Sequence, residues 1–158
     1  MRTKPPPDPT RTGSPTPRRL LIAGGMLSAF NGASHLVLPL IYPWEEHTSE
    51  LYEPVRWALF ASTTFFGLLL LWGGSLVVAL ARRGDVPATM ARWVYGGLAA
   101  FWFAGGVYEV LVPFPAPVAD LLLPAFSFGV AGLLSSGLLC RSHEGTPQRR
   151  DSAGREPP

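Results

Sequence analysis

Apolar residues gather into four long runs along this chain, and polar residues are concentrated at its ends and in the links between the runs. The runs cover residues 20–42, 57–80, 93–112 and 121–140. Each is long enough to cross the roughly 30 Å hydrocarbon layer of a bilayer, which takes about 20 helical residues. Helices of a soluble domain would alternate apolar and charged faces, and these runs do not. The pattern therefore predicts an all-α membrane protein with four transmembrane helices.

The links and the two ends indicate how these helices are arranged. The links around residues 84–89 and 113–118 are short, and short links make consecutive helices antiparallel neighbours. We therefore expect an up-down-up-down four-helix bundle over residues 19–141. Residues 1–18 and 142–158 are polar, charged and proline-containing. They hold too little apolar surface to bury, so we expect two disordered tails.

The two αα-hairpins of this bundle are candidates for an internal repeat. Residues 35–39 read His-Leu-Val-Leu-Pro and residues 109–113 read Glu-Val-Leu-Val-Pro, each at the end of an apolar run. A duplication would relate the hairpins by an axis along the membrane normal. His35 and Glu109 would then be equivalent positions. Apolar sequences also match by chance, so both explanations stay open.

Cationic residues are sorted to alternate sides of the four runs. Of the 13 Lys and Arg residues, only Arg56 lies on the side of the first and third links. The positive-inside rule then predicts that both termini are cytoplasmic. The arginines are interpreted as topology anchors near anionic lipid, so no nucleic-acid partner is expected. Abundant Arg, Ala, Gly and Pro are typical of a GC-rich bacterial genome, which favours a bacterial plasma membrane.

Polar residues inside the runs fall on one face of each predicted helix. An ionisable residue at bilayer depth costs about 2.5–3.5 kcal/mol and needs a partner or a watery cavity. We predict a polar pocket in the outer half of the bundle, for a small ligand, a lipid or a quinone. Its candidate residues are Asn31, His35, Arg56, Thr63, Trp102 and Glu109. The alternative is a structural bridge, in which Glu109 pairs with Arg56 or His35.

Small residues share these faces, because they allow close backbone approach between helices in lipid. Gly24, Gly67 and Gly105 are accordingly interpreted as packing contacts and not as parts of a site.

Metal binding and catalysis have weaker support. Glu45, Glu46 and His47 in the first outer loop, with His35 or Glu109, are weak metal-ligand candidates. Zinc and iron ligands usually follow helical or C-x-x-C spacing, so a solvated acidic loop is favoured. The chain carries no complete catalytic motif, no phosphate-binding loop and no indicated cofactor. A membrane enzyme or metal-dependent redox protein using His35 and Glu109 stays the alternative.

In span number, length and topology, the chain resembles the many small, uncharacterised four-helix membrane proteins of bacteria, and more distantly the DoxX-like group. The resemblance covers nearly all of residues 19–141 but includes no group-specific motif, so no functional residues are carried over. It implies a compact bundle with a polar interior at one membrane face. We expect a non-enzymatic protein of the lipid bilayer that binds a small ligand, or serves as a subunit of a membrane complex or homo-oligomer.

Overall fold

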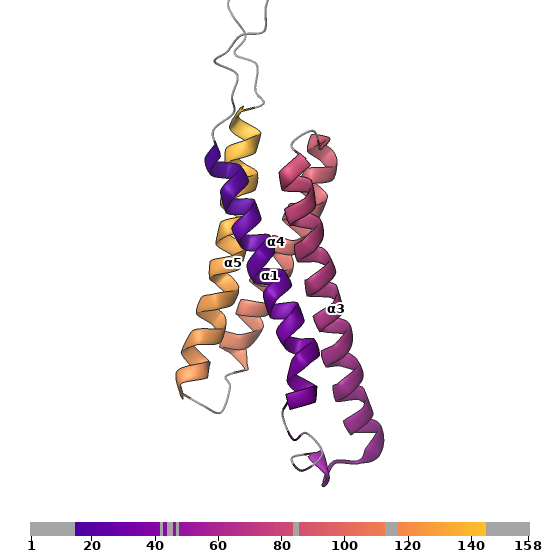
Figure 1. Ribbon diagram of the computed structural model, residues 1–158. Coiled ribbons are helices and arrows are strands. Elements are labelled where there is room, and N and C mark those ends of the chain that lie inside the picture. The colour runs from indigo at the N-terminus through magenta and orange to yellow at the C-terminus, as the bar shows by residue number, and fades with distance from the viewer. Residues whose placement is uncertain are drawn as a thin grey trace, which may run out of the picture.

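The computed structural model describes residues 15–41, 43, 46, 48–83, 86–112 and 117–144, which form four long α-helices. The helices are α1 (Pro15–Ile41), α3 (Glu53–Arg83), α4 (Ala88–Leu111) and α5 (Pro117–Glu144). All four are long and apolar enough to cross a membrane, and consecutive helices run antiparallel (Figure 1). The predicted four-helix bundle is therefore confirmed. Most of the two predicted tails lies outside the described residues, although α1 and α5 extend a short way into them.

Proline and charge mark the helix ends. Helices α1 and α5 begin at a proline, and Pro54 is the second residue of α3. Proline suits the first helical turn because an N–H there has no partner within the helix. Helix α3 also has Glu53 in its first turn and Arg82 and Arg83 in its last. These charges complement the helix dipole at both ends.

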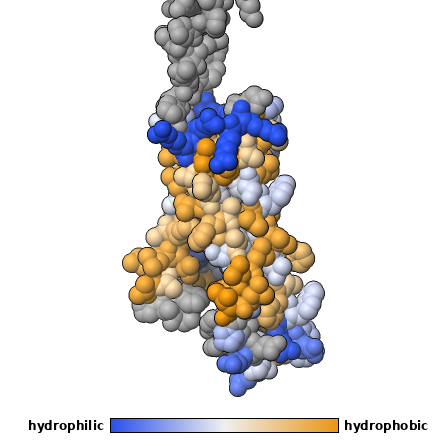
Figure 2. Space-filling model, in the orientation of Figure 1, coloured by the Kyte–Doolittle hydropathy of each residue, from blue (hydrophilic) through white to orange (hydrophobic). Residues whose placement is uncertain are grey.

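The two ends of the bundle carry opposite charges. The end where α1 and α4 begin, uppermost in Figures 1 and 2, is called the basic end; it carries Arg18, Arg19, Arg82, Arg83, Arg92 and Arg141. The other is called the acidic end, with Glu46, Glu50, Glu53 and Asp120. Arginine side chains also form hydrogen bonds between segments far apart in the chain at the basic end. An Arg18 N–H donates to the Arg82 carbonyl at 2.9 Å, and an Arg141 N–H donates to the Val86 carbonyl at 3.2 Å.

Glycines bring α1 and α3 into backbone contact. Gly25 and Gly32 of α1 face Gly74 and Gly67 of α3, respectively. A Cβ added at Gly25 would lie 2.9 Å from the Gly74 carbonyl oxygen, and one added at Gly67 would lie 3.0 Å from the Gly32 carbonyl oxygen. Close approach of this kind is what holds helices together in lipid, where apolar burial supplies little drive. The interpretation of Gly67 as a packing contact is confirmed.

Helix α5 packs on α1 in a similar way. A Cβ added at Gly24 would meet the Leu134 side chain at 2.9 Å, and one added at Gly137 would meet the Leu21 side chain at 2.7 Å. Gly24 is therefore a packing contact, as predicted.

The packing role predicted for Gly105 of α4 is wrong. A Cβ added there would meet nothing within 4 Å, whereas one added at Gly106 would lie 2.9 Å from the ring of Phe128 on α5. Consecutive residues of a helix point about 100° apart, since a turn takes about 3.6 residues. That rotation turns Gly106, and not Gly105, toward α5.

The buried apolar core occupies the basic half and the middle of the bundle. Its members are Leu21, Leu70, Val77, Leu80, Ala81, Ala91, Tyr95, Ala99, Trp102, Val130, Ala131 and Leu134. Toward the acidic end the α1–α3 hairpin diverges from the α4–α5 hairpin (Figure 1), and the surface is hollowed between them (Figure 2). Helices α3 and α4 also contact each other much less than the other neighbouring pairs. The interior is therefore most accessible in the acidic half.

Candidate functional site

A buried hydrogen-bonded chain crosses the middle of the bundle. The indole N–H of Trp102 on α4 donates to the hydroxyl of Ser28 on α1 at 3.2 Å. That hydroxyl donates to the Leu70 carbonyl on α3 at 3.4 Å. Trp102 is 4 % exposed and Ser28 is fully buried. Because buried polar groups in lipid need partners, this chain satisfies both side chains and fixes three helices together.

Trp102 was predicted to line the polar pocket, and the structure places it at the edge of the packed core. Its indole N–H is already bonded to Ser28. A ligand in the acidic half would therefore meet the ring of Trp102 and not its hydrogen-bond donor.

Five aromatic rings, here called the aromatic layer, cross the bundle beside this chain. They are His35, Phe66, Phe101, Trp102 and Phe126, with successive ring centroids 5.0, 5.5, 6.4 and 5.4 Å apart. Three of the four contacts are edge-to-face, the arrangement favoured by the ring quadrupoles. The layer draws on all four helices and lies at the boundary between the packed core and the acidic half.

His35 is the polar member of the aromatic layer. It is half-buried on α1, and its Cβ would lie 3.1 Å from a Cβ added at Gly67 of α3. Helix α1 continues through Pro39. Since proline has no N–H, the His35 carbonyl lacks its usual donor four residues later. An imidazole and a carbonyl to which Pro39 cannot donate therefore belong to the same residue at the boundary of the acidic half.

Glu109 continues the inward face of α4 on which Tyr95 and Trp102 lie, at seven-residue spacing. Its Oε2 atom is buried and has no hydrogen-bond partner, so neither Arg56 nor His35 is bonded to that oxygen. The structural-bridge alternative therefore gains no support from the described residues. A buried carboxylate oxygen without a partner is costly at bilayer depth, so this atom needs a hydrogen-bond donor from water or from a ligand.

Tyr95 offers a comparison. Its hydroxyl is likewise buried without a hydrogen bond of good geometry, but it interacts electrostatically with the guanidinium of Arg141 at the basic end. Glu109 lies toward the opposite end of the same helix, where the described side chains give its Oε2 no such neighbour.

His35 and Glu109 lie in the same half of the bundle. His35 follows Ser28 by seven residues and Glu109 follows Trp102 by seven, and Ser28 and Trp102 are hydrogen-bonded. Seven residues make about two helical turns, or roughly 10 Å. Both residues therefore continue the inward faces of their helices and are displaced toward the acidic end by the same amount. That they share one cavity stays a prediction.

Arg56 lies farther out than the other candidates. Contact between Gly32 and Gly67 sets the register of α1 against α3. Counted from that pair at about 1.5 Å per residue, Arg56 lies roughly 12 Å beyond His35 toward the acidic end. The structure thus places Arg56 near the acidic end of the bundle and not beside His35.

Thr63 and Asn31 lie close to His35 along the bundle. Thr63 borders a void with Pro39, Leu59 and Phe60 that has no room for a water molecule. Asn31 is half-buried on α1, one turn before His35. Neither residue lines a sizeable cavity among those that the described residues enclose.

The metal-ligand candidates are only partly within the described residues. Glu45 and His47 lie outside them, and Glu46 is exposed at the acidic end. In the part of the chain that the structure describes, no group of three or more His, Cys, Asp or Glu side chains is placed to hold a metal ion.

Two features were missed by sequence reasoning: the partner of Trp102 and the aromatic layer. The partner of Trp102 could have been found from the seven-residue spacing, which relates Ser28 to His35 on one helix and Trp102 to Glu109 on another. Phe66 and Phe126 carry no such signal, because phenylalanine is also common on lipid-facing surfaces of transmembrane helices.

Comparison with protein-family models, with curated proteins and with solved structures gives no match to this chain. The function is therefore inferred from the geometry of the bundle alone.

Proposed function

We infer that this protein binds a small amphiphile in the acidic half of its transmembrane bundle. The observation that carries this function is the Oε2 atom of Glu109, which is buried without a hydrogen-bond partner. An ionisable group at bilayer depth is costly and usually marks a functional site. The ligand that satisfies it carries a hydrogen-bond donor, either the hydroxyl of a quinol or the ammonium or hydroxyl group of a lipid headgroup.

The aromatic layer, about two helical turns from Glu109, supports a ligand with an apolar body. The aromatic layer supplies ring faces and edges at the base of the acidic half, with Trp102 and Phe126 on one side and Phe66 on the other. His35 offers a second polar contact at the edge of that layer. Pockets of this kind are mostly apolar, with a few polar groups that orient the ligand.

The arrangement of the helices supports entry from the membrane. Helices α3 and α4 make few contacts, and the surface is hollowed between the hairpins (Figure 2). A bilayer-dissolved amphiphile would therefore reach Glu109 laterally. The positive-inside rule assigns the basic end to the cytoplasm, and the site then lies in the outer half of a bacterial plasma membrane.

Ligand binding by purified Glu109→Gln protein tests this function. The probes are a short-chain quinol, followed by isothermal titration calorimetry, and phosphatidylethanolamine, followed by native mass spectrometry in mild detergent. A hydrogen bond to a charged group contributes about 1.5–3 kcal/mol, so affinity for the true ligand class should fall roughly tenfold to a hundredfold. Glu53→Gln, an exposed carboxylate at the same end, is the matched control and should bind normally.

The probe whose binding depends on Glu109 identifies the ligand class. Binding of both probes at full affinity by Glu109→Gln, or binding of neither by the unaltered protein, overturns the proposal. Thermal unfolding separates it from the structural bridge. A paired Glu109 would leave Arg56 unpaired on Glu109→Leu substitution, and a further Arg56→Leu change would restore the midpoint. We expect the single variant to keep its midpoint.

A further inference from the structure

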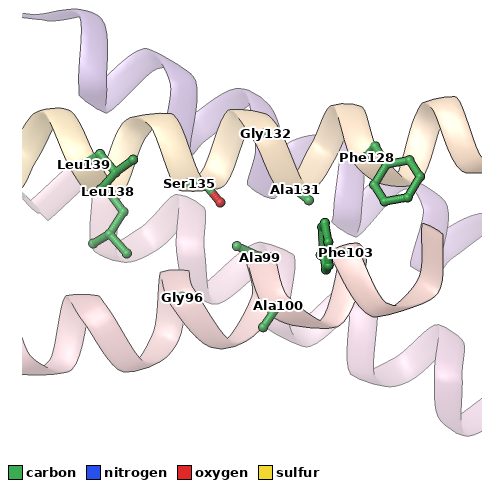
Figure 3. A pocket seen from close by; sticks show the side chains of 10 residues that line it. All are labelled: Gly96, Ala99, Ala100, Phe103, Phe128, Ala131, Gly132, Ser135, Leu138 and Leu139. Carbon is green, nitrogen blue, oxygen red and sulfur yellow. The ribbon is translucent and has the colours of Figure 1, made fainter. Parts of the chain in front are cut away.

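A groove of about 600 Å³ lies between α4 and α5, from the basic half to the middle of the bundle. It is lined by Gly96, Ala99, Ala100, Phe103, Phe128, Ala131, Gly132, Ser135, Leu138 and Leu139. Figure 3 shows the two phenylalanines facing each other at one end, the leucines at the other, and small residues between. Its lining is almost wholly apolar, with Ser135 as the exception, and so suits a hydrocarbon chain.

The groove is open to the outside of the bundle. Gly132 and Ala100 are exposed, and a Cβ added at Gly132 would meet nothing within 4 Å. Its inner end is closed by Phe103 and Phe128, whose rings meet edge-to-face at 5.6 Å. The space between α4 and α5 is thus a bounded slot on the lipid-facing surface.

The length of the groove matches one leaflet of a bilayer. Along its longer wall on α5, from Leu139 to Phe128, the helix rises about 16 Å at 1.5 Å per residue, and along α4, from Gly96 to Phe103, it rises about 10 Å. Half of a hydrocarbon layer of roughly 30 Å is about 15 Å. The groove therefore runs from the basic end to the middle of the membrane, the depth that a single acyl chain spans. A docked transmembrane helix of a second copy would span both leaflets, whereas the groove spans only one.

An arginine lies near the end of the groove that faces the basic end of the bundle. Arg92 precedes Gly96 by one helical turn on α4, toward the basic end, and Thr89 and Trp93 lie beside it. The Arg92 side chain is exposed. Trp93 is 78 % exposed, as suits an aromatic residue at headgroup depth.

We propose that the α4–α5 groove binds one anionic phospholipid, with an acyl chain between Gly96 and Gly132 and the headgroup phosphate at Arg92. The apolar slot, its leaflet length and the exposed arginine one helical turn from it together define both parts of this ligand. The site is independent of Glu109 and of the function assigned to the acidic half.

Native mass spectrometry of delipidated protein, titrated with phosphatidylglycerol or phosphatidylcholine, tests the site. Gly132→Leu fills the slot and should weaken phosphatidylglycerol binding about tenfold, which corresponds to roughly 1.4 kcal/mol. Gly129→Leu adds the same side chain at an equally open position of α5 outside the groove, and should bind within twofold of the unaltered protein.

The headgroup contact is tested separately. Arg92→Gln should lower the preference for phosphatidylglycerol over phosphatidylcholine about fivefold, the effect of one arginine at a membrane surface. Arg83→Gln, an exposed arginine of α3 at the same end, is its control. Equal losses in the two arginine variants would indicate non-specific charge attraction and overturn the site. The lipid site would also be overturned if Gly132→Leu bound phosphatidylglycerol as well as the unaltered protein does. The same holds if the unaltered protein were a dimer that Gly132→Leu dissociates without any change in lipid binding.

Discussion

Replacing glycine by alanine should shift the stability of this protein in opposite directions at two sets of positions. Gly32 lies where α1 meets α3. A Cβ added there would lie 2.6 Å from the Gly67 carbonyl oxygen and would also press on the backbone nitrogen of Leu71. Backbone atoms cannot rotate away as a side-chain end does, so Gly32→Ala must push the two helices apart. Gly97 of α4 is exposed and has nothing within 4 Å of an added Cβ.

The expected magnitudes follow from two terms. Overpacking a tight contact costs about 1–3 kcal/mol, while alanine in place of glycine in a helix gains about 0.5–1 kcal/mol. Gly32→Ala carries both terms and should destabilise the fold by about 1–2 kcal/mol net. Gly97→Ala carries only the second and should stabilise it by about 0.5–1 kcal/mol. The same methyl group thus gives opposite signs.

The assay is SDS-induced unfolding of the purified protein in mild detergent, followed by near-UV circular dichroism of its tryptophans. Gly74→Ala provides a second test at the same interface, since its added Cβ would lie 2.5 Å from the Gly25 carbonyl oxygen and the Ala29 nitrogen. Combining Gly32→Ala and Gly74→Ala should cost less than the sum, because the first separates the helices for the second. If Gly32→Ala and Gly97→Ala shift the midpoint alike, the backbone contact between α1 and α3 is refuted.

Two further predictions address the buried hydrogen bond and the topology. Ser28→Ala leaves the Trp102 indole N–H buried without its partner and should lower the unfolding free energy by about 1 kcal/mol; Ser34→Ala, whose exposed hydroxyl bonds only within α1, should change it by less than about 0.5 kcal/mol. An equal effect of the two serine variants would contradict the central hydrogen bond. In a Cys140→Ser background, Ser49→Cys at the acidic end should react with a membrane-impermeant thiol reagent on intact cells, since the positive-inside rule places that end outside. Labelling only after permeabilisation would reverse the orientation.

The sequence by itself determined the four spans and their alternating direction. An apolar run of membrane-spanning length leaves the backbone no option but a helix, because its polar groups find no water in the bilayer. Short links then make successive helices antiparallel. Helical periodicity also identified the inward faces, on which Ser28, His35, Trp102 and Glu109 lie.

Only the tertiary structure decided what those faces touch. Periodicity gives the direction of a side chain to within about one residue, roughly 100° of rotation. That error is why Gly106 and not Gly105 contacts Phe128. Periodicity also does not give the distance between two helices, because backbone separation depends on the residues of both helices at each level.

The candidate site shows the same division. The sequence placed an imidazole and a carboxylate at bilayer depth, since an ionisable residue inside an apolar run is visible without a structure. That Trp102 bonds Ser28, that Arg56 lies near the acidic end, and that Glu109 Oε2 has no partner depend on the register and divergence of the hairpins. Those properties arise from contacts between segments far apart in the chain, and no local pattern of residues encodes them.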